Sequence, residues 1–188
     1  MGRWQPDARG RLAEAAMELY TEQGFEQTTV AEIAQRAGLT ERTFFRHYAD
    51  KREVLFGGAG ALQEIFANTL AGLPASAAPM DAVGTTLEAV AAEFRERHAF
   101  ARRRQAVITA NAELRERELV KLASLSATAA DVLRRRGVKE PAASLAAEAG
   151  IAVFKVAFER WTASTGRREL SAFVRESLAE LKAVTAGS

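Results

Sequence analysis

One short stretch constrains the fold more than any other, because it holds two capped helical segments separated by a tight turn that begins with a glycine. Thr29 can cap the first segment, and Glu32, three residues later, completes a capping box. Gly38 follows, a residue type that turns a chain through positive φ without strain, and Thr40 can cap the second segment. The sequence therefore predicts a helix, a tight turn and a short helix within residues 30–47.

A helix is expected on each side of this unit. Residues 7–23 carry apolar side chains at helical spacing, and Gly24 ends that pattern. On the other side, Asp50 can cap a helix that starts at Lys51 and continues past Phe66. Three glycines weaken this helix locally and predict a bend or close packing there, at Gly57, Gly58 and Gly60.

The rest of the chain has a helical pattern throughout and no strand pattern. Small residues and proline over 73–79 indicate a loop, and five further helical segments follow. The predicted fold class is all-α, with about nine helices, in which an N-terminal three-helix unit (1–52) precedes a larger C-terminal helical bundle (53–188). The five segments are 81–97, 100–111, 113–136, 141–164 and 168–184.

Composition argues against most enzyme chemistry. The chain has no cysteine and only two histidines, His47 and His98, so thiol nucleophiles and thiolate metal sites are excluded. No metal-ligand spacing or phosphate-binding glycine loop is present, and we expect neither an enzyme nor a cofactor. No apolar run is long enough for a membrane helix, and no signal peptide is recognisable, so the expected location is the cytoplasm.

Charge is informative only locally. The net charge is +2, and residues 1–52 hold eight basic and eight acidic residues, so the overall balance says nothing about nucleic acid. Residues 42–52 are different, because they contain four basic side chains against Asp50 alone. The predicted second helix and the residues just after it therefore form a basic segment.

The second helix of the predicted unit presents two unlike faces. Leu39, Phe44 and Tyr48 share an apolar face that should pack on the preceding helices. A short helix held out by a tight turn fits the major groove of B-DNA, which is about 12 Å wide. Polar and aromatic residues occupy the opposite face and are candidates for DNA contact: Glu41, Arg42, Thr43, Phe45, Arg46 and, at the edge, His47.

These residue types divide into base-reading and phosphate-contacting groups. Arg42 can donate two hydrogen bonds to guanine, Glu41 can accept from cytosine, and Thr43 can meet a phosphate or a thymine methyl. Phosphate contacts are expected from Thr29, Thr40, His47 and Lys51. Arginines near the N-terminus could add a contact, although solvated charge is the preferred interpretation of Arg3, Arg9 and Arg11.

The sequence from Thr29 to Leu55 closely resembles the signature of the tetracycline-repressor (TetR) family, without gaps. The upstream residues 16–25 resemble the first helix of that family. Members commonly have tyrosine at the position of Phe45, so the phosphate contact of that hydroxyl is absent and van der Waals contact must replace it. The resemblance implies a one-component transcription regulator with a C-terminal domain for dimerisation and ligand binding.

The resemblance also implies that the last two helices form a four-helix bundle with those of a second subunit. The final segment carries one apolar stripe, and small residues on the preceding helix would permit close approach. Packing within one chain explains these features nearly as well. The residues expected at a homodimer interface are Val153, Trp161, Phe173, Val174, Leu178 and Leu181.

A ligand pocket is likewise implied by the resemblance. Apolar residues that could line it favour a largely apolar small-molecule effector, such as a fatty-acyl compound, an aromatic or a drug, although ordinary core packing would account for each residue alone. The basic run Arg102–Arg104 could bind an acidic group, but a solvated face is the preferred interpretation. The candidate pocket residues are Leu62, Phe66, Leu87, Phe94, Val107, Ile108, Leu122 and Phe158.

The expected function is thus a ligand-responsive repressor that binds a palindromic operator in double-stranded DNA as a homodimer. Activation, or repression that requires the ligand, would use the same parts. An effector-binding or scaffolding protein without sequence-specific DNA binding is the main alternative, and a helical hairpin with no role in DNA binding is the purely structural one. The hairpin alternative does not explain why an aromatic residue, Phe45, should be exposed beside Arg42 and Arg46.

Overall fold

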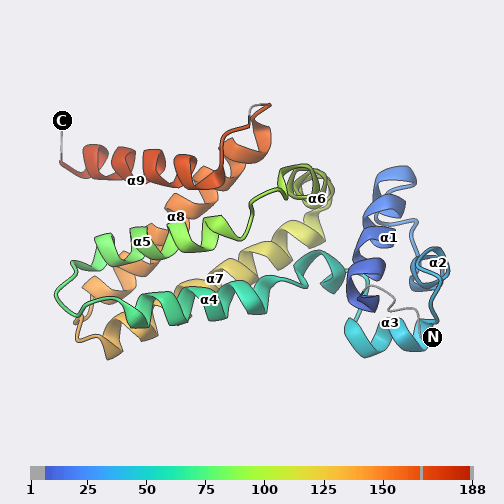
Figure 1. Ribbon diagram of the computed structural model, residues 1–188, viewed down its shortest axis with the longest axis horizontal. Helices are drawn as coiled ribbons and strands as arrows, with labels where there is room; N and C mark the ends of the chain where they lie inside the picture. The colour runs from blue at the N-terminus through green and yellow to red at the C-terminus, as the bar shows by residue number, and fades with distance from the viewer. Residues whose placement is uncertain (1–6, 166, 187–188) are drawn as a thin grey trace, which may run out of the picture. The chain divides into compact units, whose positions relative to one another are not determined.

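The computed structural model describes residues 7–165 and 167–186, so Arg3 lies outside the described residues. The described residues form helices and no strand, which confirms the all-α fold class. Figure 1 shows the helices in chain order. They are α1 (Ala8–Glu22), α2 (Val30–Arg36), α3 (Glu41–His47), the 3-10 helix η1 (Glu53–Phe56), α4 (Ala59–Gly72), α5 (Pro79–Ala92), α6 (His98–Ala110), α7 (Ala112–Arg135), α8 (Ala142–Ala163) and α9 (Leu170–Ala186).

The chain divides into two compact units. The first, called the head, comprises the described residues of Met1–Gly58 together with Arg103–Glu118. The second, called the bundle, comprises Ala59–Arg102 and the described residues from Leu119 onward. Helices α6 and α7 each contribute residues to both units.

The head is built on the contacts of α1 with α2, α3 and η1, and of α2 with α3. Leu12, Ile33 and Phe44 are fully enclosed at the centre of these contacts. The predicted helices over 7–23, 30–37 and 41–47 are confirmed to within a residue at each end. The amphipathic spacing and the caps were sufficient to predict these helices, because each helix buries one face against the other two.

The prediction of a helix that starts at Lys51 was wrong. The chain instead forms η1, passes through a turn at Gly57 and Gly58, and only then begins α4 at Ala59. Asp50 does cap this region, since its carboxylate accepts hydrogen bonds from the backbone N–H groups of Arg52 and Glu53. Two adjacent glycines favour the break because each loses more conformational freedom in a helix than any other residue.

The bundle core is formed mainly by α4, α5, α8, α9 and the C-terminal half of α7, and α8 and α9 lie side by side (Figure 1). Glycines allow the closest approaches: a side chain at Gly84 would meet Leu178, and one at Gly150 would meet Val83. The segment expected over 81–97 ends early, at the close of α5. No helix among the described residues has the length and apolar character that a membrane crossing requires.

Candidate nucleic-acid interface

The turn between α2 and α3 has the geometry that its sequence predicted. Gly38 has a φ of +64°, in the left-handed region where an L side chain is strained. Its N–H donates to Gln35 O at 2.9 Å, and Leu39 N–H donates to Ala34 O at 2.8 Å. These two bonds form a Schellman motif, which ends α2 and fixes the direction in which the chain enters α3.

Capping side chains hold the start of both helices. Thr29 Oγ1 accepts from Glu32 N–H at 3.2 Å and donates to the Glu32 carboxylate at 2.8 Å, and that carboxylate also accepts from Thr29 N–H. These bonds lower the pKa of Glu32. Thr40 Oγ1 accepts from Thr43 N–H at 3.2 Å, and the two hydroxyls lie 3.0 Å apart. Both predicted caps are present, so each threonine already has bonds within the head.

Adjacent phenylalanines show how sharply the two faces of α3 differ. Phe44 is completely buried, whereas Phe45 is 55% exposed. Tyr48 is buried with Phe44, while Leu39 on the same face is only half-buried. One side of α3 therefore belongs to the core of the head, and the other is open to solvent.

The open face carries charge that the head does not neutralise. Glu41, Arg42 and Arg46 are exposed, and Thr43 and His47 are half-buried at its edges. Within the part of the chain that the structure describes, the side chains of Arg42 and Arg46 make no ion pair or hydrogen bond. Two guanidinium groups and an aromatic ring are thus available on one helical face, a combination suited to nucleic acid.

Lys51 is held by the head itself. Its ammonium group donates to the carbonyl oxygens of Phe25 at 2.8 Å, Glu26 at 3.2 Å and Thr28 at 2.9 Å. It also lies 4.5 Å from the centroid of the Phe25 ring. An ammonium has three N–H donors, and all three are used in joining the end of α3 to the loop before α2. A phosphate contact from Lys51 would require at least one of these bonds to be released.

His47 has one enclosed and unpaired atom. Its Nε2 is buried and lacks a hydrogen-bond partner among the described residues. The imidazole therefore packs against the head rather than projecting fully into solvent like Arg46 one residue earlier.

The described N-terminal arginines also bond within the head. Arg9 donates to Gly57 O and Arg11 to Ala37 O. The Arg9 guanidinium carbon lies 5.6 Å from the centroid of the Tyr48 ring, and the Tyr48 hydroxyl donates back to Arg9 O at 3.2 Å. The interpretation as solvated charge was therefore wrong for Arg11, which is half-buried, whereas Arg9 stays exposed although it bonds within the head.

Sequence reasoning also missed the role of the basic run in α6. Arg102 is exposed, but Arg103 pairs with Glu14 at 2.9 Å, and Arg104 pairs with Glu118 at 3.1 Å while donating to Leu55 O at 2.6 Å. All partners of Arg103 and Arg104 belong to the head. The expected solvated face was thus wrong for two of the three arginines. No local pattern distinguishes them, because their partners are distant in sequence.

The residues expected to line a ligand pocket fall into different parts of the molecule. Five belong to the bundle core or pack against it: Leu62, Phe66, Leu87, Phe94 and Phe158. Phe94 lies 5.4 Å, centroid to centroid, from Phe158. Val107 and Ile108 are buried in the head, and Leu122 is half-buried on α7 outside that core.

Four of the six residues expected at a homodimer interface are buried within the single chain. They are Val153, Trp161, Phe173 and Val174, and Leu178 and Leu181 are half-buried. The intrachain contact of α8 with α9 accounts for this burial. Any surface that these helices offer to another molecule is therefore made largely by other residues.

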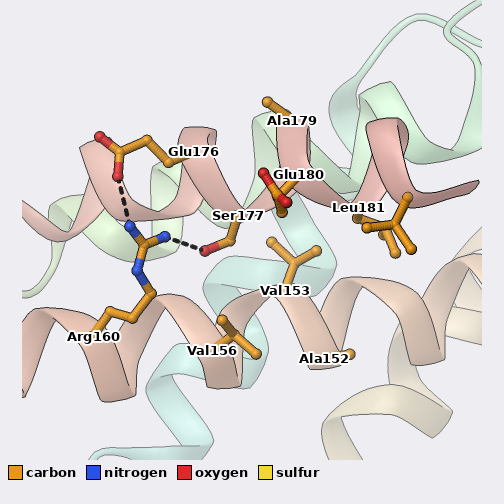
Figure 2. Close-up of a pocket in the computed structure, with 10 residues that line it drawn as sticks. Ala152, Val153, Val156, Arg160, Glu176, Ser177, Ala179, Glu180 and Leu181 are labelled. Atoms are coloured by element: carbon orange, nitrogen blue, oxygen red, sulfur yellow. Dashed lines mark hydrogen bonds and ion pairs between the residues drawn. The ribbon is translucent and has the colours of Figure 1, made fainter. Parts of the chain in front are cut away.

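A groove of about 720 Å³ runs between α8 and α9 (Figure 2). Its large exposed apolar residues are Val156 at 48% and Val184 at 69%, and the less exposed Val153 and Leu181 also line it. At one end, Arg160 reaches from α8 to α9 and donates to Glu176 Oε2 at 3.0 Å, and its second nitrogen lies 3.4 Å from the Ser177 hydroxyl. A hydrogen bond from Arg168 lowers the pKa of Glu176, and the ion pair with Arg160 adds to this effect.

A capped helix-turn-helix with one open helical face, followed by a helical bundle, places the chain in the class of helix-turn-helix proteins. A sequence model of bacterial regulatory proteins of the TetR family matches residues 12–56. A second model, described as the MftR C-terminal domain, matches residues 77–186, which is more than half of the chain. The chain therefore belongs to the TetR family of bacterial regulatory proteins.

Individual relatives agree with this assignment. The chain is 39% identical over 88 residues to the HTH-type transcriptional regulator TcmR of Streptomyces glaucescens, a match that covers 47% of this chain and 39% of TcmR. It spans less than half the length of the curated relatives that it matches.

Solved structures share the fold over nearly the whole chain. FadR of Bacillus subtilis in complex with stearoyl-CoA has a TM-score of 0.65 at 19% identity, covering 92% of this chain and 96% of that one. FadR of Thermus thermophilus in complex with lauroyl-CoA has a TM-score of 0.56 at 24% identity, covering 93% of each chain. At these identities the likeness concerns the fold.

Proposed function

We propose that this protein is a ligand-responsive transcriptional repressor that binds a palindromic operator in double-stranded DNA as a homodimer. The observation that carries the proposal is the open face of α3, where Arg42, Phe45 and Arg46 are exposed on a helix whose other face is buried. A structural surface gains nothing from this combination, whereas a DNA-reading helix needs it. Since its DNA would be bacterial, we place its action in the cytoplasm.

The open face can be divided by chemistry. Arg42 and Glu41 are exposed near the start of α3, where a recognition helix meets base edges, and they would pair with guanine and cytosine. Phe45 would contact sugar or a thymine methyl. Phosphate groups would be contacted by Arg46 and by the exposed parts of four further residues: Thr29, Thr40, Thr43 and His47. Lys51 would serve mainly by holding the loop before α2, given its three bonds to carbonyl oxygens.

A second copy of the chain would bind at the groove between α8 and α9. Val156 and Val184 leave apolar surface exposed there, next to the charged pair of Arg160 and Glu176. An apolar centre with a polar edge is the usual composition of a protein interface. Two heads in one dimer could then read half-sites about one helical turn of DNA apart, roughly 34–36 Å.

The effector would be a largely apolar small molecule that enters the bundle. The core residues Leu62, Phe66, Leu87, Phe94 and Phe158 offer apolar and aromatic surface to such a ligand. Fatty acyl-CoA is a class to test first, because the two FadR proteins of the same fold are described in complex with it. A hundredfold loss of operator affinity on ligand binding needs a coupling free energy of about 2.7 kcal/mol.

The proposal is tested by selecting bound molecules from a pool of random DNA duplexes with the purified full-length protein. We expect a palindromic sequence with two half-sites, whose complex with the protein dissociates when stearoyl-CoA, lauroyl-CoA or another apolar candidate is added. Recovery of unrelated sequences with equal affinity would contradict DNA recognition and support an effector-binding or scaffolding protein instead.

The dimer surface is tested separately by light scattering after size-exclusion chromatography. We expect Val156→Glu to convert a dimer into a monomer, because it places a charge in the apolar part of the groove. Leu145→Glu is the matched control, since Leu145 is also exposed on α8 but does not line the groove. A dimer that survives Val156→Glu and dissociates with Leu145→Glu would place the interface elsewhere.

A further inference from the structure

We propose that residues 103–118, at the junction of α6 and α7, form part of the DNA-binding machinery, with Arg104 as a positioning residue for the chain that follows α3. The inference rests on the proposed function, since it concerns how the DNA-reading helix is held. It differs from the division expected from the sequence, in which residues 1–52 bind DNA and residues 53–188 serve the ligand and the dimer.

Arg104 makes three kinds of contact with the head. Its side chain is only 19% exposed, and Nε donates to Leu55 O at 2.6 Å. Nη1 pairs with Glu118 at 3.1 Å, and the guanidinium carbon lies 5.1 Å from the centroid of the Phe56 ring. Burial lowers the pKa of Arg104, and Glu118 opposes that effect. A charge this enclosed is costly unless it is paired, so the contacts fix Arg104 and η1 together.

Three further ion pairs bind residues 103–118 to the rest of the head, two of them to the chain between α3 and α4 and one to α1. The pairs of Arg52 and Arg103 lie at the surface, so each contributes little alone, whereas Glu53 is about as enclosed as Arg104. The pairs are Arg52 with Glu113, Arg117 with Glu53, and Arg103 with Glu14.

The chain between α3 and α4 is thereby held from two sides. On one side the Tyr20 hydroxyl donates to Lys51 O at 2.6 Å, and the Lys51 ammonium binds the loop before α2. On the other side Arg104 holds Leu55 and Phe56. Because α3 ends only a few residues before η1, loss of Arg104 frees the segment that anchors the end of α3.

The contact of Arg104 with η1 also bears on regulation, because α6 and α7 continue beyond the head. Helix α6 begins at His98 and α7 ends at Arg135, so both helices extend beyond residues 103–118. The route from η1 to α4 is instead interrupted at Gly57 and Gly58. A shift of α6 or α7 on ligand binding would thus act on Leu55 through Arg104.

The experiment compares hydrogen exchange in the full-length wild type, Arg104→Met and the control Arg102→Met, without DNA. Arg102 is the neighbouring arginine and is exposed in the bundle, so its loss removes the same charge without touching η1. We expect exchange of the amides of residues 41–56 to be about tenfold faster in Arg104→Met and within about twofold of wild type in Arg102→Met. Amides of α9 should exchange at the wild-type rate in both variants.

Conservative variants keep the test decisive if Arg104→Met does not fold. Glu118→Gln removes the charge that faces Arg104 and should accelerate exchange over residues 41–56 about threefold. Arg104→Lys keeps the charge and should restore protection to within about threefold of wild type. Wild-type protection of residues 41–56 in both Arg104→Met and Glu118→Gln, or in Glu118→Gln alone if Arg104→Met is unfolded, would overturn the proposal.

A second arm uses the duplex recovered by selection. Arg104→Met should weaken its binding about tenfold with an unchanged slope of log affinity against log salt, because Arg104 contacts no phosphate. Arg102→Met should bind within about twofold of wild type. Full affinity of Arg104→Met would overturn the positioning role. If the wild type selects no sequence, the proposed function fails, while the exchange arm still decides whether Arg104 holds the segment after α3.

Discussion

The head and the bundle are each stabilised by a different kind of interaction. In the head, charged side chains repeatedly bind backbone carbonyl oxygens far away in the sequence, as Lys51 does at Thr28, Arg11 at Ala37 and Arg104 at Leu55. In the bundle, apolar side chains and glycines pack closely, as Gly150 does against Val83. One polar exception is Arg136, which binds the carbonyl oxygens at the end of α4.

This difference suits the two proposed tasks. Directional hydrogen bonds fix the orientation of a short helix, and α3 must be oriented to reach base edges. Apolar packing has no preferred direction, and a core made of it can admit a largely apolar ligand by rearranging side chains.

The largest contrast is expected between the two phenylalanines of α3. Phe44→Ala removes a completely buried ring and should lower the free energy of unfolding by about 4 kcal/mol. Phe45→Ala truncates an exposed ring and should change it by less than about 0.5 kcal/mol, while weakening binding to the selected duplex. Urea unfolding and DNA titration measure the two effects. Equal loss of stability in both variants would mean that α3 has no open face.

Close packing of the bundle is tested at Gly150. Gly150→Leu places a branched side chain where even a Cβ would overlap Val83, and it should destabilise the protein by about 3 kcal/mol. Gly60→Ala is the control, since a Cβ there meets nothing within 4 Å and a helical alanine should be neutral or stabilising by up to about 1 kcal/mol. Thermal unfolding of both variants gives the comparison. A tolerated Gly150→Leu would show that the bundle is loosely packed at this position.

Lys51→Met tests whether Lys51 serves the head or the DNA. Methionine has a side chain of similar length but no ammonium group, so it loses the cation–π contact with the Phe25 ring and leaves three carbonyl oxygens without their charged donor. We therefore expect a loss of about 2 kcal/mol in stability. The salt dependence of DNA binding should stay unchanged. Unaltered stability, together with a slope of log affinity against log salt concentration that is smaller by about one, would instead identify Lys51 as a phosphate contact.

Acid should weaken the region around Asp50. Hydrogen bonds from Arg52, first of all from its guanidinium, hold the pKa of Asp50 below the ordinary value of 3.8. The unfolded chain therefore takes up this proton at a higher pH than the folded one, and stability is lost as the pH falls through about 4. Urea midpoints from pH 5.5 to 3.0 should decrease more for wild type than for Asp50→Asn. Parallel curves would show that Asp50 does not contribute.

The local sequence predicted the helices of the head far better than it predicted the long-range contacts that complete the head. Thr29, Glu32, Gly38 and Thr40 act within a few residues of their partners, so their pattern predicted α2, the turn and α3. The bonds of Arg104 are different, because its partner Leu55 is 49 positions away and nothing in a run of arginines indicates which one is enclosed.

The bundle was predictable as helices but not as a site. Periodicity shows that Val153 and Phe173 lie on apolar faces, yet it cannot distinguish burial against the same chain from burial against a second copy. The glycines also mattered through their neighbours: Gly57 and Gly58 separate η1 from α4, while Gly84 and Gly150 permit close helix packing. Identical residues thus have effects that only the three-dimensional contacts reveal.

The central claim is that the open face of α3 reads DNA sequence, and Arg42 tests it most directly. Its guanidinium is exposed and makes no hydrogen bond or ion pair with the described residues of the head, so Arg42→Ala should leave the fold intact. Selection from random duplexes should then yield the wild-type palindrome with the preference lost at one base pair in each half-site and kept at the others. An unchanged preference at every position would contradict the claim.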